Sequence, residues 1–195
     1  MPRERREQLI LDVAGQVFAR AGYEAAPMDE IADRAGVSKP MLYTYFGSKE
    51  GLYLAYIERA GGELLERLVG AKAPDGSPAS MLRARITEFL SFVEEHRDGW
   101  QVLFRELGST RLFAERVAGL RERIAAAIRI MVQDSAGACS GHPPLAADAI
   151  AHALVGAGES LANWWLDHPE VSRDQVAAWY FGVVQAVVSG AADRR

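Results

Sequence analysis

The segment from Val37 to Lys49, VSKPMLYTYFGSK, gathers side chains that suit contact with a nucleic acid. It holds hydroxyl groups, two lysines and compact apolar groups in a stretch too short to be a good core helix. Hydroxyl and ammonium groups bind phosphate oxygens, while hydroxyls and methyl groups also contact base edges in a major groove. With Leu42 on the inner side of a helix, the outward side carries Lys39, Pro40, Met41, Tyr43 and Thr44.

The local charge pattern agrees with this chemistry. From Arg34 through Lys49 the sequence has three cations and no acid. Lys49 is expected in the first turn of the next helix, where exposed backbone N–H groups already favour an anion. The alternative for Lys49 is a solvated charge beside a helix end, and the sequence favours the two interpretations about equally.

Short elements must position these side chains. Met28 to Ala35 is predicted to be a helix that begins after Pro27, a residue suited to a first turn. A tight turn follows at 36–37, and Ser38 can cap a second helix that ends near Tyr45. Two short helices joined by a tight turn indicate a helix-turn-helix.

Helical periodicity continues along the chain, and no strand-like alternation interrupts it. The pattern predicts helices over about 5–21, 28–35, 38–45, 49–69, 81–96, 110–133, 145–166 and 172–191, with a short piece around 100–107. The segment 70–80 is rich in Gly, Pro and Ser and is predicted to be a loop. We therefore expect an all-α protein with a three-helix helix-turn-helix domain at 1–60 and a larger helical domain at 61–195.

Composition argues against several classes of protein. The formal net charge of −4 disfavours a broad basic surface but permits a small local one, because salt screens charges beyond about 10 Å at 0.1 M. The single cysteine, Cys139, excludes an internal disulfide framework and a cysteine-rich zinc site. Since neither a signal peptide nor a membrane-spanning window is visible, we expect a cytoplasmic protein with no membrane partner.

No catalytic motif is recognisable. The sequence has no glycine-rich phosphate loop, no HExxH and no G-x-S-x-G elbow. Asp148, His152 and Glu159 could share one helix face and hold a metal, but a single helix rarely supplies all the ligands. A solvated or ion-paired stripe explains them better. We therefore expect no catalytic residue, no metal and no cofactor.

Three groups of residues at fixed spacings occur together near the N-terminus. They are Gly22-Tyr23, Ile31-Ala32-x-x-Ala35-Gly36-Val37-Ser38 and Leu42-Tyr43-x-Tyr45-Phe46-x-Ser48-Lys49-Glu50. This pattern resembles the DNA-binding domain of the tetracycline-repressor-like (TetR) family of bacterial transcriptional regulators. The resemblance implies a homodimer that binds a palindromic operator in double-stranded DNA, usually as a repressor. It also implies release from the operator when a small-molecule effector binds the C-terminal domain, which would serve for ligand binding and dimerisation.

Carried over residue by residue, the resemblance names the residues that would meet DNA. They are Ser38, Lys39, Pro40, Tyr43, Thr44 and Lys49, of which Tyr43 and Lys49 fall where the family commonly contacts phosphates. Ala26-Pro27 departs from the family, which usually has Ser or Thr there, so one cap hydroxyl is missing. Pro40 replaces a frequent glycine and should stiffen the start of the recognition helix. Arginines at 3, 5 and 6 could form a basic arm, although solvated charges are the alternative.

The second half of the chain has aromatic residues mixed with polar ones, a composition typical of a mostly apolar pocket. The residues expected to bind the effector are Phe92, His96, Trp100, Phe104, Arg105 and Trp164. For any one of the aromatic residues, plain core packing is the favoured alternative.

The last two predicted helices are apolar over a wide face. Part of that face must cover the chain's own core, and its width leaves some for a second copy in a four-helix interface. The residues expected at the homodimer interface are Gly158, Trp165, Val176, Tyr180 and Val184.

The leading interpretation is a ligand-responsive, dimeric DNA-binding regulator that represses transcription. The first alternative is a DNA-binding regulator with no small-molecule effector. The second, from another class, is an all-α enzyme or carrier whose N-terminal helices are structural, and the spacings within 22–50 count against it. Gly61-Gly62 interrupts the long helix from Lys49 and is either a compliant joint between the two domains or a site of close packing.

Overall fold

The computed structural model describes residues 2–97, 99–100, 111–134 and 144–190. Every regular element within these residues is a helix, which confirms the all-α fold. The chain forms two compact units. The first comprises Met1–Gly62 and His96–Val117, and the second comprises Glu63–Glu95 and Ala118–Arg195.

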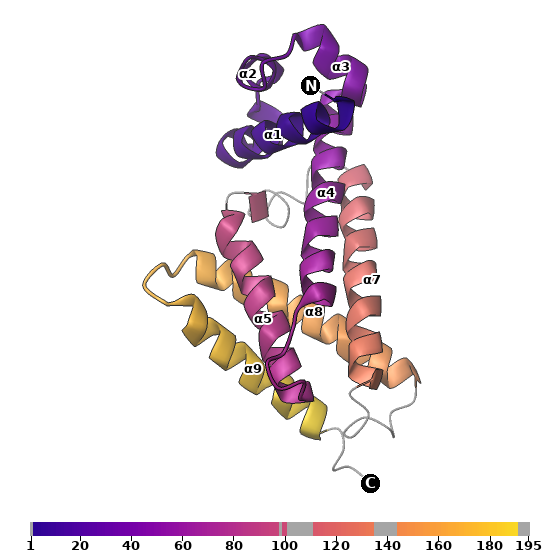
Figure 1. Cartoon of the computed structure of the whole chain (residues 1–195), viewed down its shortest axis with the longest axis vertical. Coiled ribbons are helices and arrows are strands. Elements are labelled where there is room, and N and C mark those ends of the chain that lie inside the picture. Colours follow the sequence, from indigo (N-terminus) through magenta and orange to yellow (C-terminus); the bar gives the residue numbers. More distant parts are fainter. Residues whose placement is uncertain (1, 98, 101–110, 135–143, 191–195) are drawn as a thin grey trace. The chain divides into compact units, whose positions relative to one another are not determined.

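The first unit is built on four helices near the N-terminus, shown in indigo to purple in Figure 1. They are α1 (Arg3–Ala25), α2 (Met28–Arg34), α3 (Lys39–Phe46) and the first part of α4 (Lys49–Gly70). Their shared core contains Ile10, Ala14, Val17, Phe18, Ile31, Leu42, Leu52 and Ile57, each at most 2% exposed. These apolar residues recur at helical spacing on each helix, so burying them fixes which face of α3 points outward.

Glycine and serine residues set the helix ends in this unit. Gly22 has a φ of 74°, so α1 is kinked there, directly after residue 21, where the predicted helix ends. The predicted Ser38 cap forms, since its Oγ accepts a hydrogen bond from the Met41 N–H. The Ser48 Oγ caps α4 in the same way and accepts a hydrogen bond from the Gly51 N–H. At α2, Pro27 offers no side-chain cap, as its replacement of Ser or Thr implied.

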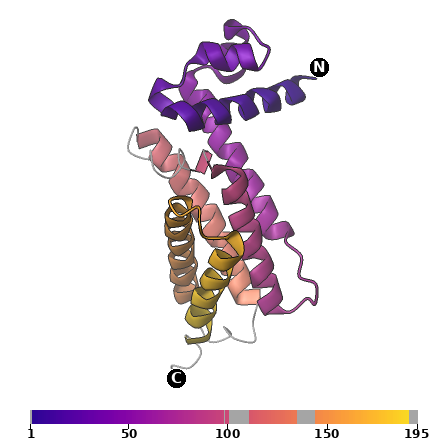
Figure 2. The same ribbon diagram turned by 90° about the vertical axis from the view of Figure 1, so that its left-hand side faces the viewer.

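The second unit contains the rest of α4, α5 (Pro78–Glu95), most of α7 (Arg111–Asp134), α8 (Pro144–Leu166) and α9 (Arg173–Gly190). The α9 helix packs against both α5 and α8, and Figures 1 and 2 show α5 beside it from two sides. Leu90, Val93, Ala151, Trp165 and Val176 are at most 1% exposed and form the centre of this packing.

The division between the units falls within α4, directly after Gly62. It lies close to the predicted boundary at 60–61, but the first unit also takes in His96–Val117, which that boundary assigned to the second domain. The boundary of the DNA-binding domain itself stays a prediction. None of the helices within the described residues is both long and apolar enough to cross a membrane.

Candidate nucleic-acid interface

The turn between α2 and α3 positions the outward side of α3. Gly36 adopts a φ of 65°, a conformation that glycine takes without steric cost, and the Val37 N–H bonds the Ala32 carbonyl across the turn at 3.0 Å. Leu42 is fully buried, so it fixes the rotation of α3 about its own axis. Gly47, with a φ of 74°, ends the helix and allows α4 to begin at Lys49.

The buried Leu42 leaves the predicted DNA-binding residues of α3 on the surface. Ser38, Lys39, Pro40, Tyr43 and Thr44 are not buried, and Met41 lies among them at 37% exposure. The Thr44 Oγ1 donates a hydrogen bond to the Pro40 carbonyl at 2.9 Å. Its hydroxyl hydrogen is therefore used within the helix, and its oxygen lone pairs and methyl group are what it can offer to a base edge.

Lys39 has a partner that the sequence did not reveal. Its Nζ lies 2.9 Å from both carboxylate oxygens of Asp29, a residue of the first turn of α2. The hydrogen bond from Lys39 to Asp29, followed by the charge of Asp29, raises the pKa of Lys39 above its ordinary value. Lys39 is thus firmly cationic, but it must exchange a carboxylate for any contact with DNA.

Lys49 lies at the start of α4, beside the end of α1. Its Nζ donates a 2.7 Å hydrogen bond to the Glu24 carbonyl and lies 5.2 Å from the centroid of the Tyr23 ring. An ammonium group in the first turn of a helix is close to exposed N–H groups that also attract an anion. The arrangement can therefore supply a cation and a helix terminus to the same phosphate.

Two arginines at the start of α1 meet the far end of α3. The Arg3 guanidinium lies 5.4 Å from the centroid of the Tyr45 ring, and an Arg6 Nη lies 3.5 Å from the Tyr45 hydroxyl. The sequence indicated an arginine arm but not Tyr45 as its partner, because 39 residues separate Arg6 from Tyr45. A cationic group thus lies at each end of the exposed side of α3.

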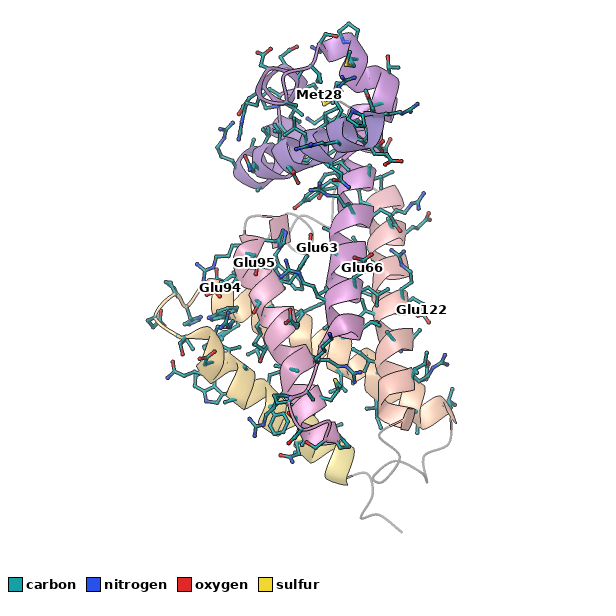
Figure 3. All side chains as sticks on the ribbon, viewed as in Figure 1. Met28, Glu63, Glu66, Glu94, Glu95 and Glu122 are labelled. Carbon is teal, nitrogen blue, oxygen red and sulfur yellow. The ribbon has the colours of Figure 1, made fainter. Side chains whose placement is uncertain are left out.

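The residues predicted to bind an effector are divided between the units. Phe92, on α5 in the second unit, is 2% exposed, and the Arg67 guanidinium lies 5.6 Å from its ring centroid. Arg67 in turn pairs at 2.7 Å with Glu63 and Glu95, both labelled in Figure 3. Trp164 is 40% exposed and stacks on His168 with 4.1 Å between ring centroids.

Two other members of that set, His96 and Trp100, belong to the first unit. Trp100 is 1% exposed there, and its N–H bonds the His96 carbonyl at 2.7 Å. Phe104 and Arg105 lie outside the described residues. Burial of Phe92 and Trp100 agrees with the packing role that the sequence also allowed for the aromatic residues.

The five residues predicted at the dimer interface lie inside the protomer's own core. Trp165, Val176, Tyr180 and Val184 are at most 8% exposed, and Gly158 is buried. The Tyr180 hydroxyl donates a 2.6 Å hydrogen bond to the Leu154 carbonyl, and burial raises the pKa of Tyr180 to about 12. Their exposed apolar neighbours on the same helices are Trp164, Trp179, Val183 and Val187.

The possible metal ligands on α8 do not converge. The Glu159 carboxylate forms a two-pronged salt bridge with Arg121 of α7, at 2.8 and 2.9 Å from the guanidinium Nε. The His152 Nε2 faces Glu122 of α7 at 3.1 Å, and its Nδ1 faces the Asp148 carbonyl at 3.0 Å. These side chains form an ion-paired seam between α7 and α8, the alternative that the sequence favoured.

Comparison with known proteins places this architecture in a family. Residues 10–56 match the model of bacterial regulatory proteins of the tetR family, and residues 78–187 match that of the tetracyclin repressor-like C-terminal domain. The HTH-type transcriptional activator FasR of Mycolicibacterium smegmatis is 36% identical over 168 residues, which are 86% of this chain and 75% of FasR.

Solved structures agree. A TetR-like transcriptional regulator from Rhodococcus sp. RHA1 superposes with a TM-score of 0.76 at 36% identity, over 97% of this chain and 99% of the other. A tetR-family regulator from Streptomyces coelicolor gives a TM-score of 0.78 at 26% identity, over 98% and 85%. The chain therefore belongs to the tetR family and is a DNA-binding transcriptional regulator.

Proposed function

We propose that the protein is a homodimeric repressor that binds a palindromic operator through α3 and leaves it when a small molecule binds the C-terminal domain. The observation that carries the DNA-reading part is the exposed side of α3, where Lys39, Tyr43 and Thr44 lie together. A B-form major groove is about 12 Å wide and admits one helix of this kind. In this proposal Thr44 and Lys39 meet base edges, while Tyr43 and Lys49 meet phosphates.

The dimer is proposed to form through the exposed stripe on α9. Trp179, Val183 and Val187 recur every four residues and are 51%, 52% and 39% exposed in one protomer. Trp164 of α8 extends the stripe, with its ring centroid 6.3 Å from that of Trp179. If two protomers pair through this stripe about a twofold axis, each stripe is buried against its copy. Twofold symmetry is the commonest symmetry of homodimers. Two α3 helices would then face successive major grooves, about 34–36 Å apart.

Ligand control is proposed from the match of residues 78–187 to the tetracyclin repressor-like C-terminal domain. To empty an operator from 99% to 1%, a ligand must favour the released state by about 5.5 kcal/mol in total. Two sites in a dimer share this load, so each must contribute about half of it.

Activation of transcription is a second candidate, because FasR, 36% identical to this chain, is named an activator. Transcription in vitro from a promoter that carries the bound sequence distinguishes repression from activation. Repression predicts less transcript as protein is added, whereas activation predicts more. No change in transcript would contradict both.

The DNA assignment is tested with Lys49→Ala and Thr44→Ala. Lys49→Ala should weaken binding to all duplexes alike and lower the slope of log affinity against log salt by about 0.9 for each phosphate that the lysine neutralises. Thr44→Ala should leave the slope unchanged and alter which sequences are preferred. An unchanged affinity and slope in Lys49→Ala would show that this lysine does not hold a phosphate.

A further inference from the structure

An aromatic cluster in the first unit includes one residue that lies far along the chain from the DNA-binding helices. Phe113 of α7 is 3% exposed, and its ring centroid lies 4.7 Å from that of Tyr23 and 4.7 Å from that of Tyr53. Both contacts are edge-to-face, the geometry that aromatic pairs prefer. Phe113 falls within the segment that matches the C-terminal family model, yet it packs with the N-terminal helices.

Side-chain packing has to hold the Tyr23 ring, because the helix before it is broken. Gly22 has a φ of 74°, so the backbone of Tyr23 does not continue α1 in regular geometry. Within the described residues, the rings of Phe18, Tyr53 and Phe113 lie around Tyr23, at 6.2, 4.9 and 4.7 Å between centroids. Phe113 and Tyr53 are the two nearest of these rings, so removing Phe113 should leave the Tyr23 ring freer to move.

Tyr23 in turn lies under Lys49, whose Nζ is 5.2 Å from the ring centroid. A cation over an aromatic face contributes about 0.5–1 kcal/mol at an exposed site. Together with the bond from Nζ to the Glu24 carbonyl, this contact restricts where the lysine side chain points. An ordered lysine loses less side-chain entropy when it binds a phosphate than a freely rotating one.

We propose that Phe113 is a positioning residue for DNA binding, which orients Lys49 through the ring of Tyr23. The inference rests on the phosphate contact of Lys49 proposed above. In this proposal a residue of α7 contributes indirectly to DNA binding, and the later residues of α7 belong to the second unit. A change at the start of α7 would therefore reach a phosphate contact without any rearrangement of α3.

The test measures binding to a fluorescent duplex of random sequence, which reports phosphate contacts because they dominate non-specific affinity. Phe113→Ala should weaken binding by about two- to fivefold, the equivalent of the cation–π contribution. In a Lys49→Ala background, Phe113→Ala should cause no further weakening. Val117→Ala is the matched control: Val117 lies one turn further on α7, is 1% exposed and belongs to the same unit. It should leave duplex binding unchanged in both backgrounds.

Each outcome decides a different point. An equal weakening by Phe113→Ala in both backgrounds, or none in either, would overturn the positioning role while leaving the Lys49 contact intact. A Lys49→Ala protein with unchanged affinity and salt slope would overturn the proposed phosphate contact and the positioning role with it. If Phe113→Ala fails to fold, Phe113→Leu keeps most of the buried volume without the ring and carries the same comparison.

Discussion

The ion pair between Lys39 and Asp29 affects how the exposed side of α3 can contact DNA. Lys39 is the cation best placed to meet a base edge, yet Asp29 holds it and adds a negative charge beside the same surface. Exposed ion pairs contribute only about 0.2–1 kcal/mol, so a phosphate or a base can displace the carboxylate. If Lys39 meets DNA as proposed, Asp29 should lower its affinity for any duplex and favour duplexes that offer it a better partner.

Asp29→Asn should therefore bind random duplexes more tightly and discriminate less between sequences. We expect this gain because Lys39 would no longer have to leave a carboxylate before it contacts a base edge, and because one negative charge beside the exposed side of α3 is removed. Asp33→Asn is the control, because Asp33 is an exposed carboxylate of the same helix and changes the net charge equally. If both variants gain affinity by the same factor, the effect belongs to net charge and not to Lys39.

The contacts of single residues could be predicted from the sequence where the two partners are close along the chain. Ser38 and Ser48 each cap a helix by accepting a hydrogen bond from the backbone N–H three residues later. This short spacing is visible in the sequence. Asp29 with Lys39 and Arg6 with Tyr45 are separated by 10 and 39 residues, so only the fold brings them together. Side chains that meet across a turn or between helices were beyond the reach of spacing arguments.

At the scale of helices, the boundaries were predicted closely because glycine, proline and serine mark them locally. The inner face of α9 was not. Val176, Tyr180 and Val184 form one stripe, and Trp179, Val183 and Val187 form another, so α9 is apolar on more than one side. Periodicity cannot tell which of two apolar stripes covers the chain's own core. Contact with α5 and α8 decides it.

Gly62 lies in α4 at the division between the units, and its replacement tests whether the glycine serves packing or flexibility of the helix. A Cβ at this position would meet nothing within 4 Å, so close packing does not require a glycine here. Gly62→Ala should raise the free energy of unfolding by about 0.5–1 kcal/mol, because alanine loses less entropy than glycine in a helix.

Gly158→Ala of α8 is the contrasting variant, measured by the same urea titration. Its Cβ would lie 3.0 Å from the Tyr180 hydroxyl, which the Leu154 carbonyl already holds, so we expect no gain or a decrease in stability. A Gly62→Ala protein that is less stable than the parent would return Gly62 to a packing role. A stable variant with an altered effector response would support the compliant joint.

The seam between α7 and α8 should make stability depend on pH. The bond to the Asp148 carbonyl, then that to the Glu122 carboxylate, raises the pKa of His152 above its ordinary value. Glu122 is labelled on α7 in Figure 3. Because the folded value exceeds the unfolded value of about 6.5, the stabilisation is complete below that pH and is lost as pH rises through the folded value. Arg129 also pairs with Asp148, at 3.6 Å.

We therefore expect the urea midpoint of the parent protein to fall between about pH 6 and pH 8, and that of His152→Gln to fall less. The comparison cancels other titrating groups, since both proteins share them. Parallel pH profiles for the two proteins would show that His152 does not contribute.

At the scale of the whole molecule, the proposed function requires two copies of the chain. The exposed stripe of α9 is the surface proposed for pairing. Its Trp179 is the residue whose removal should matter most, since buried tryptophans often dominate interface energy. Trp179→Glu should give a folded monomer that no longer binds the operator, measured by sedimentation and by duplex titration.

Val184→Glu is the matched variant on the other side of α9. Val184 is 4% exposed, so an unpaired charge there would be buried within the protomer and should unfold it rather than release a monomer. A Trp179→Glu protein that remains a dimer would move the interface away from this stripe.

Selection of bound sequences from a pool of random duplexes tests the central claim most directly. A dimer that reads DNA with two copies of α3 should enrich a palindrome whose half-sites are centred about 10–10.5 base pairs apart, or a few more, because one helical turn separates successive major grooves. The Lys49→Ala protein should enrich the same palindrome with lower affinity. Enrichment of a single asymmetric site, or no enrichment by the parent protein, would contradict the account.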